Sequence, residues 1–193
     1  GAEKIKNLIK LCKDRGGKNL TIFCFSTENW NRSREEINYL MRLFQKSIKD
    51  NFKKFKNQDI KIKVIGQRER LPKFLQKEII RAELSTKDKK EMTVNFALSY
   101  GGRAELVSAF QKIIAKKIPP ENITEQVISE NLWTSDLDLI IRTGKEKRIS
   151  NFLIWQAAYS ELHFSQKSWP DFTEKDLDLA FEEYANRTRR FGK

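Results

Sequence analysis

The feature that most constrains the fold is an alternation of short apolar runs with longer amphipathic stretches along the whole chain. Residues 20–25 form a nearly continuous apolar run, which is typical of a strand buried on both faces of a parallel sheet. Residues 60–64 alternate Ile or Val with Lys and predict a strand with one solvated face. Apolar runs at 92–98, 137–141 and 162–164 predict three more strands.

Helical spacing of apolar residues fills the segments between these strands. A capping-box pattern at 33–36 precedes the longest of these stretches. The predicted helices cover residues 5–12, 37–55, 74–84, 106–114, 124–132, 151–158 and 173–184. Strands that alternate with helices require crossover connections, so the sequence predicts an α/β fold. We expect a single domain of 193 residues, with a mostly parallel β-sheet flanked by helices.

The composition favours a soluble cytoplasmic protein with a substantial core. Hydrophobic residues make up 39% of the chain, and the mean hydropathy is −0.64. No apolar run reaches the length of about 18 residues that a membrane-spanning helix needs. Cys12 and Cys24 occupy apolar positions and are interpreted as buried, reduced thiols. A disulfide or a metal pair is not expected, because His163 is the only histidine and no metal-ligand spacing occurs.

The formal net charge of +12 fits nucleic acid, an anionic membrane surface or anionic small substrates. Much of this excess lies in scattered lysines, such as Lys49 and Lys53, which are typical of solvated helix faces. Function is therefore sought in the few arginines of the loops. In open parallel sheets, ligands bind beyond the carboxyl ends of the strands. The connections after residues 25, 98 and 141 are thus the candidate binding loops.

Two of these loops carry groups that suit phosphate. Residues 25–32 combine hydroxyl, amide, indole and guanidinium groups between a strand and a helix. Capping plus one aromatic anchor explains the same residues equally well. Residues 142–151 place four cations and two hydroxyls around Gly144, without the order or spacing of a P-loop. A solvated basic turn is the alternative there. Glu161, between Ser160 and Leu162, is either an edge residue or a carboxylate for Mg²⁺.

Several motifs together resemble one enzyme family. The segment Phe-Ser-Thr-Glu-Asn-Trp-Asn-Arg at 25–32, with Glu36, resembles the signature of the cis-prenyltransferases, and most closely that of bacterial undecaprenyl diphosphate synthases. Ser-Tyr-Gly-Gly-Arg at 99–103 and Asp-Leu-Ile-Ile-Arg-Thr-Gly at 138–144 are similar to two further signatures. Trp155, Gln156, Tyr159, Glu161 and the Trp-Pro-Asp-Phe of 169–172 extend the third, and Arg190-Phe191-Gly192 matches the family's ending. The motifs occur in the family's order over the whole chain.

The resemblance implies elongation of an allylic diphosphate by isopentenyl diphosphate units. The starter is expected to be farnesyl diphosphate. The expected product is a long polyprenyl diphosphate such as undecaprenyl diphosphate, a lipid carrier for cell-wall synthesis that partitions to the membrane. It also implies Mg²⁺ dependence, a homodimer and a cytoplasmic enzyme with peripheral membrane contact. Residues 1–193 align with the family's domain after its N-terminal strand and Asp-bearing phosphate loop, so that Asp is not among them.

Residue roles follow from the same resemblance. Arg142, Arg148 and Ser150 would hold isopentenyl diphosphate, and Glu161 would help to place Mg²⁺. Glu36 would orient the first loop. Arg190 and Gly192 would reach a neighbouring subunit's site. Substrate binding by the first loop would involve Ser26, Thr27, Glu28, Asn29, Trp30 and Arg32, with Asn29 and Ser26 as the catalytic candidates for proton removal.

Ser33, Lys145 and Gln67 depart from the family pattern, which usually has Pro, a small residue and Asp at these positions. Two other functions compete with this interpretation. A non-catalytic accessory subunit would keep the fold, but it would lose substrate-loop residues that this chain retains. A basic nucleic-acid-binding protein fits the charge, yet no nucleic-acid signature occurs and the aromatic residues are not interleaved with a basic stripe. We therefore expect no nucleic-acid partner.

Overall fold

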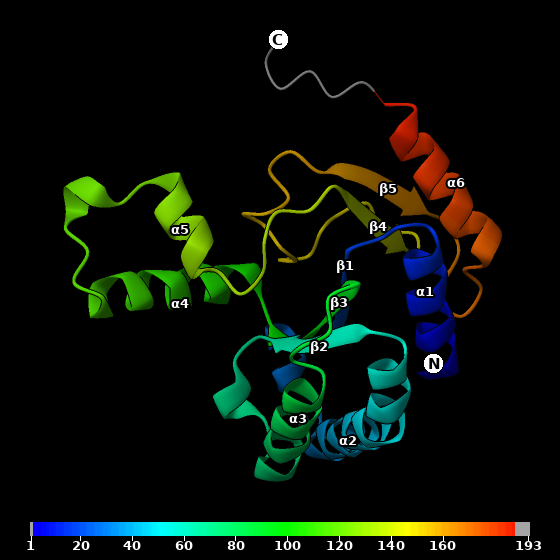
Figure 1. Cartoon of the computed structure of the whole chain (residues 1–193), viewed down its shortest axis with the longest axis horizontal. Helices are drawn as coiled ribbons and strands as arrows, with labels where there is room; N and C mark the ends of the chain where they lie inside the picture. The colour runs from blue at the N-terminus through cyan, green and yellow to red at the C-terminus, as the bar shows by residue number, and fades with distance from the viewer. Residues whose placement is uncertain (1, 188–193) are drawn as a thin grey trace. The chain divides into compact units, whose positions relative to one another are not determined.

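The computed structural model describes residues 2–187, with the side chains of 2, 51–54 and 56 left out of the description. Within the described residues, the backbone forms two compact units, 2–105 and 106–187. Figure 1 traces the elements of both units.

The first unit contains a three-stranded parallel sheet. The strand order is β1-β3-β2, so β3 is central and each connection between parallel strands crosses over through a helix. The elements are α1 (Ala2–Asp14), β1 (Asn19–Ser26), the short 3₁₀ helix η1 (Thr27–Asn31), α2 (Arg34–Asn57), β2 (Ile60–Ile65), η2 (Arg68–Arg70), α3 (Lys73–Ser85), β3 (Met92–Tyr100) and the first turn of α4 (Gly102–Ala115).

The second unit contains the rest of α4 and a two-stranded parallel sheet. The elements after α4 are η3 (Pro120–Asn122), α5 (Glu125–Asn131), β4 (Leu139–Thr143), β5 (Glu161–Ser165) and α6 (Glu174–Ala185). Strands β4 and β5 pair in parallel over their full length. Lys112 and Lys116 of α4 donate to the backbone and side-chain oxygens of Asn131 at 2.9 and 2.7 Å, which ties α4 to α5.

The predicted α/β class with parallel strands and flanking helices is confirmed. The helix predicted at 151–158 is wrong, because this segment consists of turns. Ser150, Asn151 and Leu153 all have left-handed backbones, with φ values of 50°, 60° and 46°. A right-handed helix cannot begin or continue through such residues. Apolar spacing alone could not reveal this, because turns can also bury Leu153.

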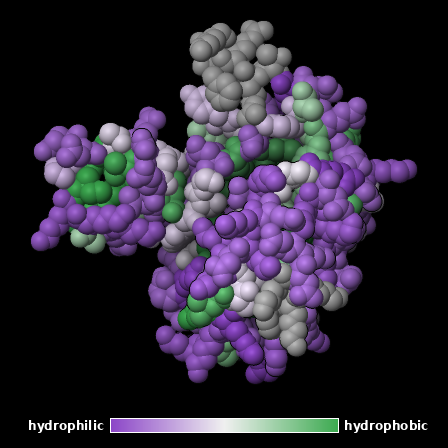
Figure 2. All heavy atoms as spheres, viewed as in Figure 1, coloured by the Kyte–Doolittle hydropathy of each residue, from purple (hydrophilic) through white to green (hydrophobic). Residues whose placement is uncertain are grey.

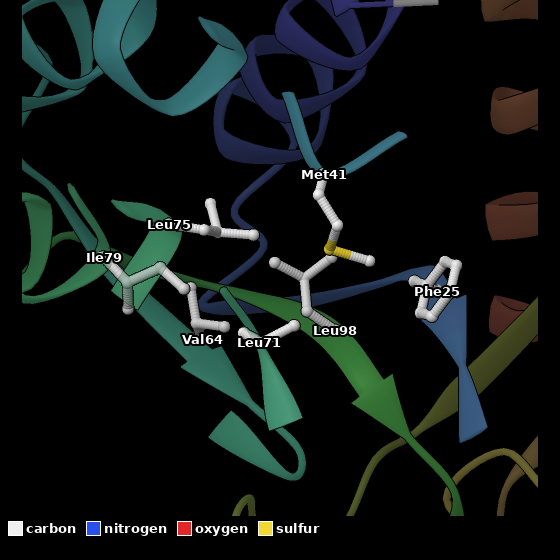
Figure 3. Packing of buried hydrophobic residues seen from close by; sticks show 7 residues of the cluster. All are labelled: Phe25, Met41, Val64, Leu71, Leu75, Ile79 and Leu98. Carbon is white, nitrogen blue, oxygen red and sulfur yellow. The ribbon is translucent and has the colours of Figure 1, made fainter. Parts of the chain in front are cut away.

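Helices α2 and α3 contact β2 and each other, and they pack with the three strands to form the core of the first unit. Figure 3 shows seven buried side chains that meet there: Phe25, Met41, Val64, Leu71, Leu75, Ile79 and Leu98. They come from three strands, two helices and the loop before α3. The long apolar stripe of α2 faces this cluster: Met41 is fully buried, and Leu40, Phe44 and Ile48 pack beside it partly buried.

The outer edge of β2 is closed by side chains instead of another strand. The amide of Ile62 donates to Thr86 Oγ1 at 3.1 Å, and the amide of Val64 donates to Glu83 Oε1 at 2.8 Å. Arg68 Nε donates to the Val64 carbonyl at 2.8 Å, and its Nη1 donates to Glu83 Oε2 at 2.8 Å. Backbone groups that an edge strand would leave unpaired thus find partners on α3 and η2.

The turn after β2 depends on a glycine. Gly66 has φ +127°, and a Cβ added there would lie 2.0 Å from the carbonyl oxygen of Leu98. The next residue, Gln67, donates its amide to the Ser99 carbonyl at 3.0 Å. The end of β2 is therefore pressed against the end of β3 without room for a side chain.

Both cysteines are free thiols among residues 2–187. Burial raises the pKa of Cys12 to about 11 and that of Cys24 to about 12. Both therefore stay protonated and unreactive at neutral pH.

No helix among residues 2–187 combines the length and the hydrophobicity that a membrane span requires. The face shown in Figure 2 is mostly hydrophilic, with hydrophobic side chains at several separate places, one of them on the segment that carries α4 and α5.

Replacing Gly66 by Ala should destabilise the protein by about 3 kcal/mol or more, because the new methyl group overlaps a buried carbonyl and the backbone favours glycine. Gly16→Ala is the matched control. Gly16 also has a positive φ, of +82°, but open space around its Cβ, so only about 1 kcal/mol of backbone strain is expected. Urea unfolding of both variants measures the difference. Equal losses would show that the close approach to Leu98 is unimportant.

Candidate active site

The predicted site residues fall into two groups, one in each compact unit. We call residues 26–32 the tryptophan loop and residues 142–151 the arginine loop. Each follows or ends a parallel strand at its carboxyl end, β1 in the first case and β4 in the second. This is the position at which parallel sheets present ligand-binding groups.

The tryptophan loop is ordered by its own polar side chains. The amide of Ser26 donates to Asn29 Oδ1 at 2.9 Å, and the two residues form the capping box of η1. Thr27 Oγ1 donates to Glu28 Oε2 at 3.1 Å. The box uses the acceptor oxygen of Asn29, so the side-chain NH₂ of Asn29 is not consumed by it.

Trp30 connects this loop to the end of the central strand. Its Nε1–H donates to Ser99 Oγ at 2.8 Å, and its ring meets Phe25 edge-on with centroids 5.1 Å apart. The Arg70 guanidinium lies over the same indole, 5.0 Å from the ring centroid. Ser99 was predicted only as part of the motif at 99–103, and Arg70 belongs to none of the predicted site motifs. Its sole sequence signal is an arginine in the turn after a strand.

Arg32 and Glu36 form an ion pair at the junction of the loop with α2. Arg32 Nη1 donates to Glu36 Oε1 at 2.7 Å, and the Glu36 amide donates to Ser33 Oγ at 3.2 Å. About half of each charged side chain is exposed, so the pair contributes at most about 1 kcal/mol. The geometry is compatible with the loop-orienting role predicted for Glu36, and that role stays a prediction.

Arg142 organises the arginine loop from inside. Its Nη1 donates to the Arg148 carbonyl at 2.6 Å and to Ser150 Oγ at 2.8 Å. Three residues predicted to bind one diphosphate therefore lie together. The left-handed backbones of Ser150 and Asn151 reverse the chain at this point. Gly144, with φ +104°, donates its amide to the Lys167 carbonyl at 2.7 Å and fixes the start of the loop.

The arginine loop retains unused positive charge. Within the described residues, Arg142 Nε is buried and has no hydrogen-bond partner. Glu146 is the nearest counter-charge, with a carboxylate oxygen 3.9 Å from Arg142 Nη2 and another 4.0 Å from Arg148 Nη2. Both separations are too long for good hydrogen bonds. The side chain of Arg148 is 66% exposed and can meet an incoming anion.

Glu161 opens β5, and its Oε2 accepts a hydrogen bond from Arg187 Nη1 at 2.5 Å. No cluster of three or more His, Cys, Asp or Glu side chains able to hold a metal occurs among the described residues. Glu161 could provide one or two oxygens to a metal, with other oxygens required from elsewhere. The two remaining predicted site residues, Arg190 and Gly192, lie outside the described residues.

A family profile described as "Putative undecaprenyl diphosphate synthase" matches residues 1–192. The chain belongs to this prenyltransferase family. An isoprenyl transferase from Fusobacterium nucleatum is 46% identical over 194 residues, which cover 100% of this chain and 84% of that relative. An isoprenyl transferase from Aquifex aeolicus is 41% identical, with 100% and 84% covered.

Two solved structures have the same fold. A probable undecaprenyl diphosphate synthase from Campylobacter jejuni superposes with a TM-score of 0.92 at 34% identity, covering 99% of this chain and 91% of its own. A lavandulyl diphosphate synthase from Lavandula x intermedia, in complex with dimethylallyl diphosphate, superposes with a TM-score of 0.95 at 36% identity, covering 100% and 86%. The predictions of a cis-prenyltransferase fold and of a prenyl-transferring enzyme are confirmed.

Arg142→Ala should loosen the arginine loop, because two hydrogen bonds from a charged donor are lost. Partly exposed bonds of this kind stabilise by about 1.5 kcal/mol or more, so trypsin should cut after Lys147 about tenfold faster. Mass spectrometry of timed digests measures the rate. Ser150→Ala, which removes one of the two bonds, should lie between wild type and Arg142→Ala. A wild-type rate in both variants would contradict the role of Arg142, provided that their circular dichroism melts match.

Proposed function

We propose that this chain condenses isopentenyl diphosphate onto an allylic diphosphate, farnesyl diphosphate in the first instance, and repeats the step. The product would be a long cis-polyprenyl diphosphate such as undecaprenyl diphosphate, for use as a cell-wall lipid carrier. The observation that carries the proposal is the gathering of Arg142, Arg148 and Ser150 on one loop, where Arg142 bonds the other two.

Isopentenyl diphosphate is assigned to the arginine loop. A diphosphate needs several charge-assisted hydrogen bonds. The buried Nε of Arg142, the exposed guanidinium of Arg148 and the hydroxyl of Ser150 can donate them. A diphosphate could also replace the long contacts to Glu146, because it carries more charge and can approach more closely.

The allylic diphosphate is assigned to the tryptophan loop. The indole of Trp30 offers an apolar surface for the isoprenoid, and Arg32 adds a cation at the rim. In the reaction, the C1–O bond breaks and its electron pair leaves with the diphosphate, while the isopentenyl double bond attacks C1. A proton then passes from C2 of the isopentenyl unit to a diphosphate oxygen or to water. Asn29 Oδ1 already accepts the Ser26 amide. A donor role for the Asn29 NH₂ is therefore the better-supported contribution, with the Ser26 hydroxyl beside it.

Mg²⁺ is proposed as the metal, held by Glu161 together with substrate oxygens and water. A single carboxylate ligand is enough for this ion, which usually keeps several waters and binds through one or two carboxylates. Bound Mg²⁺ would neutralise the charge of the leaving diphosphate. The ion pair with Arg187 would have to share or release one Glu161 oxygen.

A homodimer is proposed, and the exposed face of α4 supports it. Val107, Phe110 and Ile114 are 56%, 44% and 74% exposed and recur on one side of the helix. An apolar stripe of this kind usually meets a partner.

Arg190 and Gly192 are assigned to the neighbouring subunit's diphosphate site. Residues 1–193 are assigned to one catalytic domain, with the essential Asp in the family's N-terminal phosphate loop.

A cytoplasmic location with peripheral membrane contact is also proposed, because the product is a lipid. Ile80 and Leu84 of α3 are 53% and 63% exposed. Lys73, Lys77 and Arg81 belong to the same outer face by helical spacing. Exposed aliphatic residues among cations suit an anionic lipid surface.

The direct test is incubation of the full-length protein with labelled isopentenyl diphosphate, Mg²⁺ and either farnesyl or dimethylallyl diphosphate. Chain-length analysis of the extracted lipid should show long products from farnesyl diphosphate. Products formed only from dimethylallyl diphosphate, without chain growth, would replace the proposal with an activity nearer to that of the lavender enzyme. No prenyl transfer at all would refute it.

Arg148→Ala should raise the KM for isopentenyl diphosphate by about 10- to 100-fold, because a charge-assisted contact worth about 1.5–3 kcal/mol is lost. Lys147→Ala is the matched control, since it removes an adjacent exposed cation that has no assigned role. Steady-state kinetics with saturating farnesyl diphosphate measure the effect. If the two variants have the same KM, Arg148 does not bind this substrate.

Glu161→Ala should shift the Mg²⁺ concentration for half-maximal activity upward by about tenfold or more, because the carboxylate proposed to bind the metal is removed. Glu182→Ala, an exposed carboxylate on α6, serves as the control. Direct titration of Mn²⁺ binding in the presence of substrate gives a readout independent of turnover. Unchanged titrations would remove Glu161 from the metal site.

A further inference from the structure

The indole of Trp30 is held on three sides by residues distant in sequence. Ser99 Oγ accepts the Nε1–H, the Phe25 ring contacts the indole edge-on, and the Arg70 guanidinium lies over the ring. Ser99 is fully buried and Phe25 is 2% exposed, so these two contacts come from fixed groups. Arg70 is exposed and is the adjustable member of the three.

The turn that carries Arg70 is nevertheless rigid. Gly66 lies against Leu98, the Gln67 amide donates to Ser99, and Arg68 is bonded to Val64 and Glu83. On the other side, Leu71 is 3% exposed in the core. The backbone of Arg70 is thus fixed between anchored neighbours. Its Nη1 donates to Gln67 Oε1 at 3.1 Å, which directs the guanidinium further.

The charge of Arg70 is not neutralised by these contacts. The partners described for it within residues 2–187 are the amide of Gln67 and the π face of Trp30, and both are neutral. A guanidinium at this distance from an indole centroid is attracted by the ring quadrupole. Arg70 therefore gains a preferred position while it remains a full cation beside the tryptophan loop.

We propose that Arg70 is a positioning residue for the allylic substrate, because its guanidinium holds the Trp30 indole in the orientation that receives the isoprenoid. This rests on the proposed function of the tryptophan loop. Without Arg70, the indole keeps its hydrogen bond to Ser99 but is free to tilt, so a smaller fraction of the protein is competent to bind. The apparent affinity falls by that fraction, whereas turnover at saturation does not change.

The kinetic test compares Arg70→Ala, Arg70→Lys and Arg42→Ala in the full-length protein. Arg70→Ala should raise the KM for farnesyl diphosphate about two- to fivefold at unchanged kcat, the range that an exposed cation–π contact supports. Arg70→Lys keeps a cation over the ring and should return KM to within about twofold of wild type. Arg42→Ala removes an exposed guanidinium from α2 and should behave as wild type.

A second readout needs no catalysis. Acrylamide quenching of tryptophan fluorescence is measured for Arg70→Ala in the wild-type background and in a Trp30→Phe background. Loss of Arg70 uncovers one face of the indole, so quenching should increase in the first background and stay constant in the second. The difference isolates Trp30 from Trp133, Trp155 and Trp169.

The outcomes distinguish the positioning role of Arg70 from the proposed prenyl-transfer function. Increased quenching together with the KM shift supports the positioning role. Increased quenching without a KM shift, or a kcat loss that Lys does not rescue, would overturn it. Unchanged quenching would overturn it as well, because Arg70 would then not hold the indole. If the wild-type protein transfers no prenyl group, the proposed function fails, and the quenching comparison still decides whether Arg70 fixes Trp30.

Discussion

The end of the central strand β3 fixes two loops that follow its neighbours on either side. The buried hydroxyl of Ser99 accepts the Trp30 indole N–H, and the carbonyl of the same residue accepts the Gln67 amide. Ser99 has φ +51°, which turns the strand away at this point and presents both groups. Ser99 therefore anchors both the turn after β2 and the tryptophan loop after β1. Displacement of that residue would move Trp30 and Arg70 together.

Most of the fold could be predicted from the sequence, because the spacing of apolar residues indicates which face of each strand or helix is buried. The strands at β1, β2 and β3 and the capping of α2 at Ser33 match their patterns. The strand β4 begins two residues later than predicted, at Leu139, because apolar character alone does not mark where pairing starts. The pairing of strands into a three-stranded and a two-stranded sheet was likewise not readable from local patterns.

The candidate site was predicted by residue type but not by geometry. Motif resemblance named Trp30, Arg142, Arg148 and Ser150, and the structure adds which atoms meet. The contact between Trp30 and Arg70 joins residues forty positions apart, so no local pattern could show it. The predicted helix at 151–158 failed for a related reason. The bonds from Arg142 to Ser150 Oγ and the Arg148 carbonyl favour a chain reversal that helix periodicity does not register.

The closed edge of β2 bears on how this protein behaves while it folds. An open strand edge can template another chain, and β-rich intermediates aggregate in this way. Here Thr86 and Glu83 accept hydrogen bonds from the amides of Ile62 and Val64, and Arg68 donates to the carbonyl of Val64. These side chains come from a helix and a turn that directly follow β2 in sequence. Protection of the edge can therefore form early and locally, which leaves newly made chains few opportunities to stack through β2.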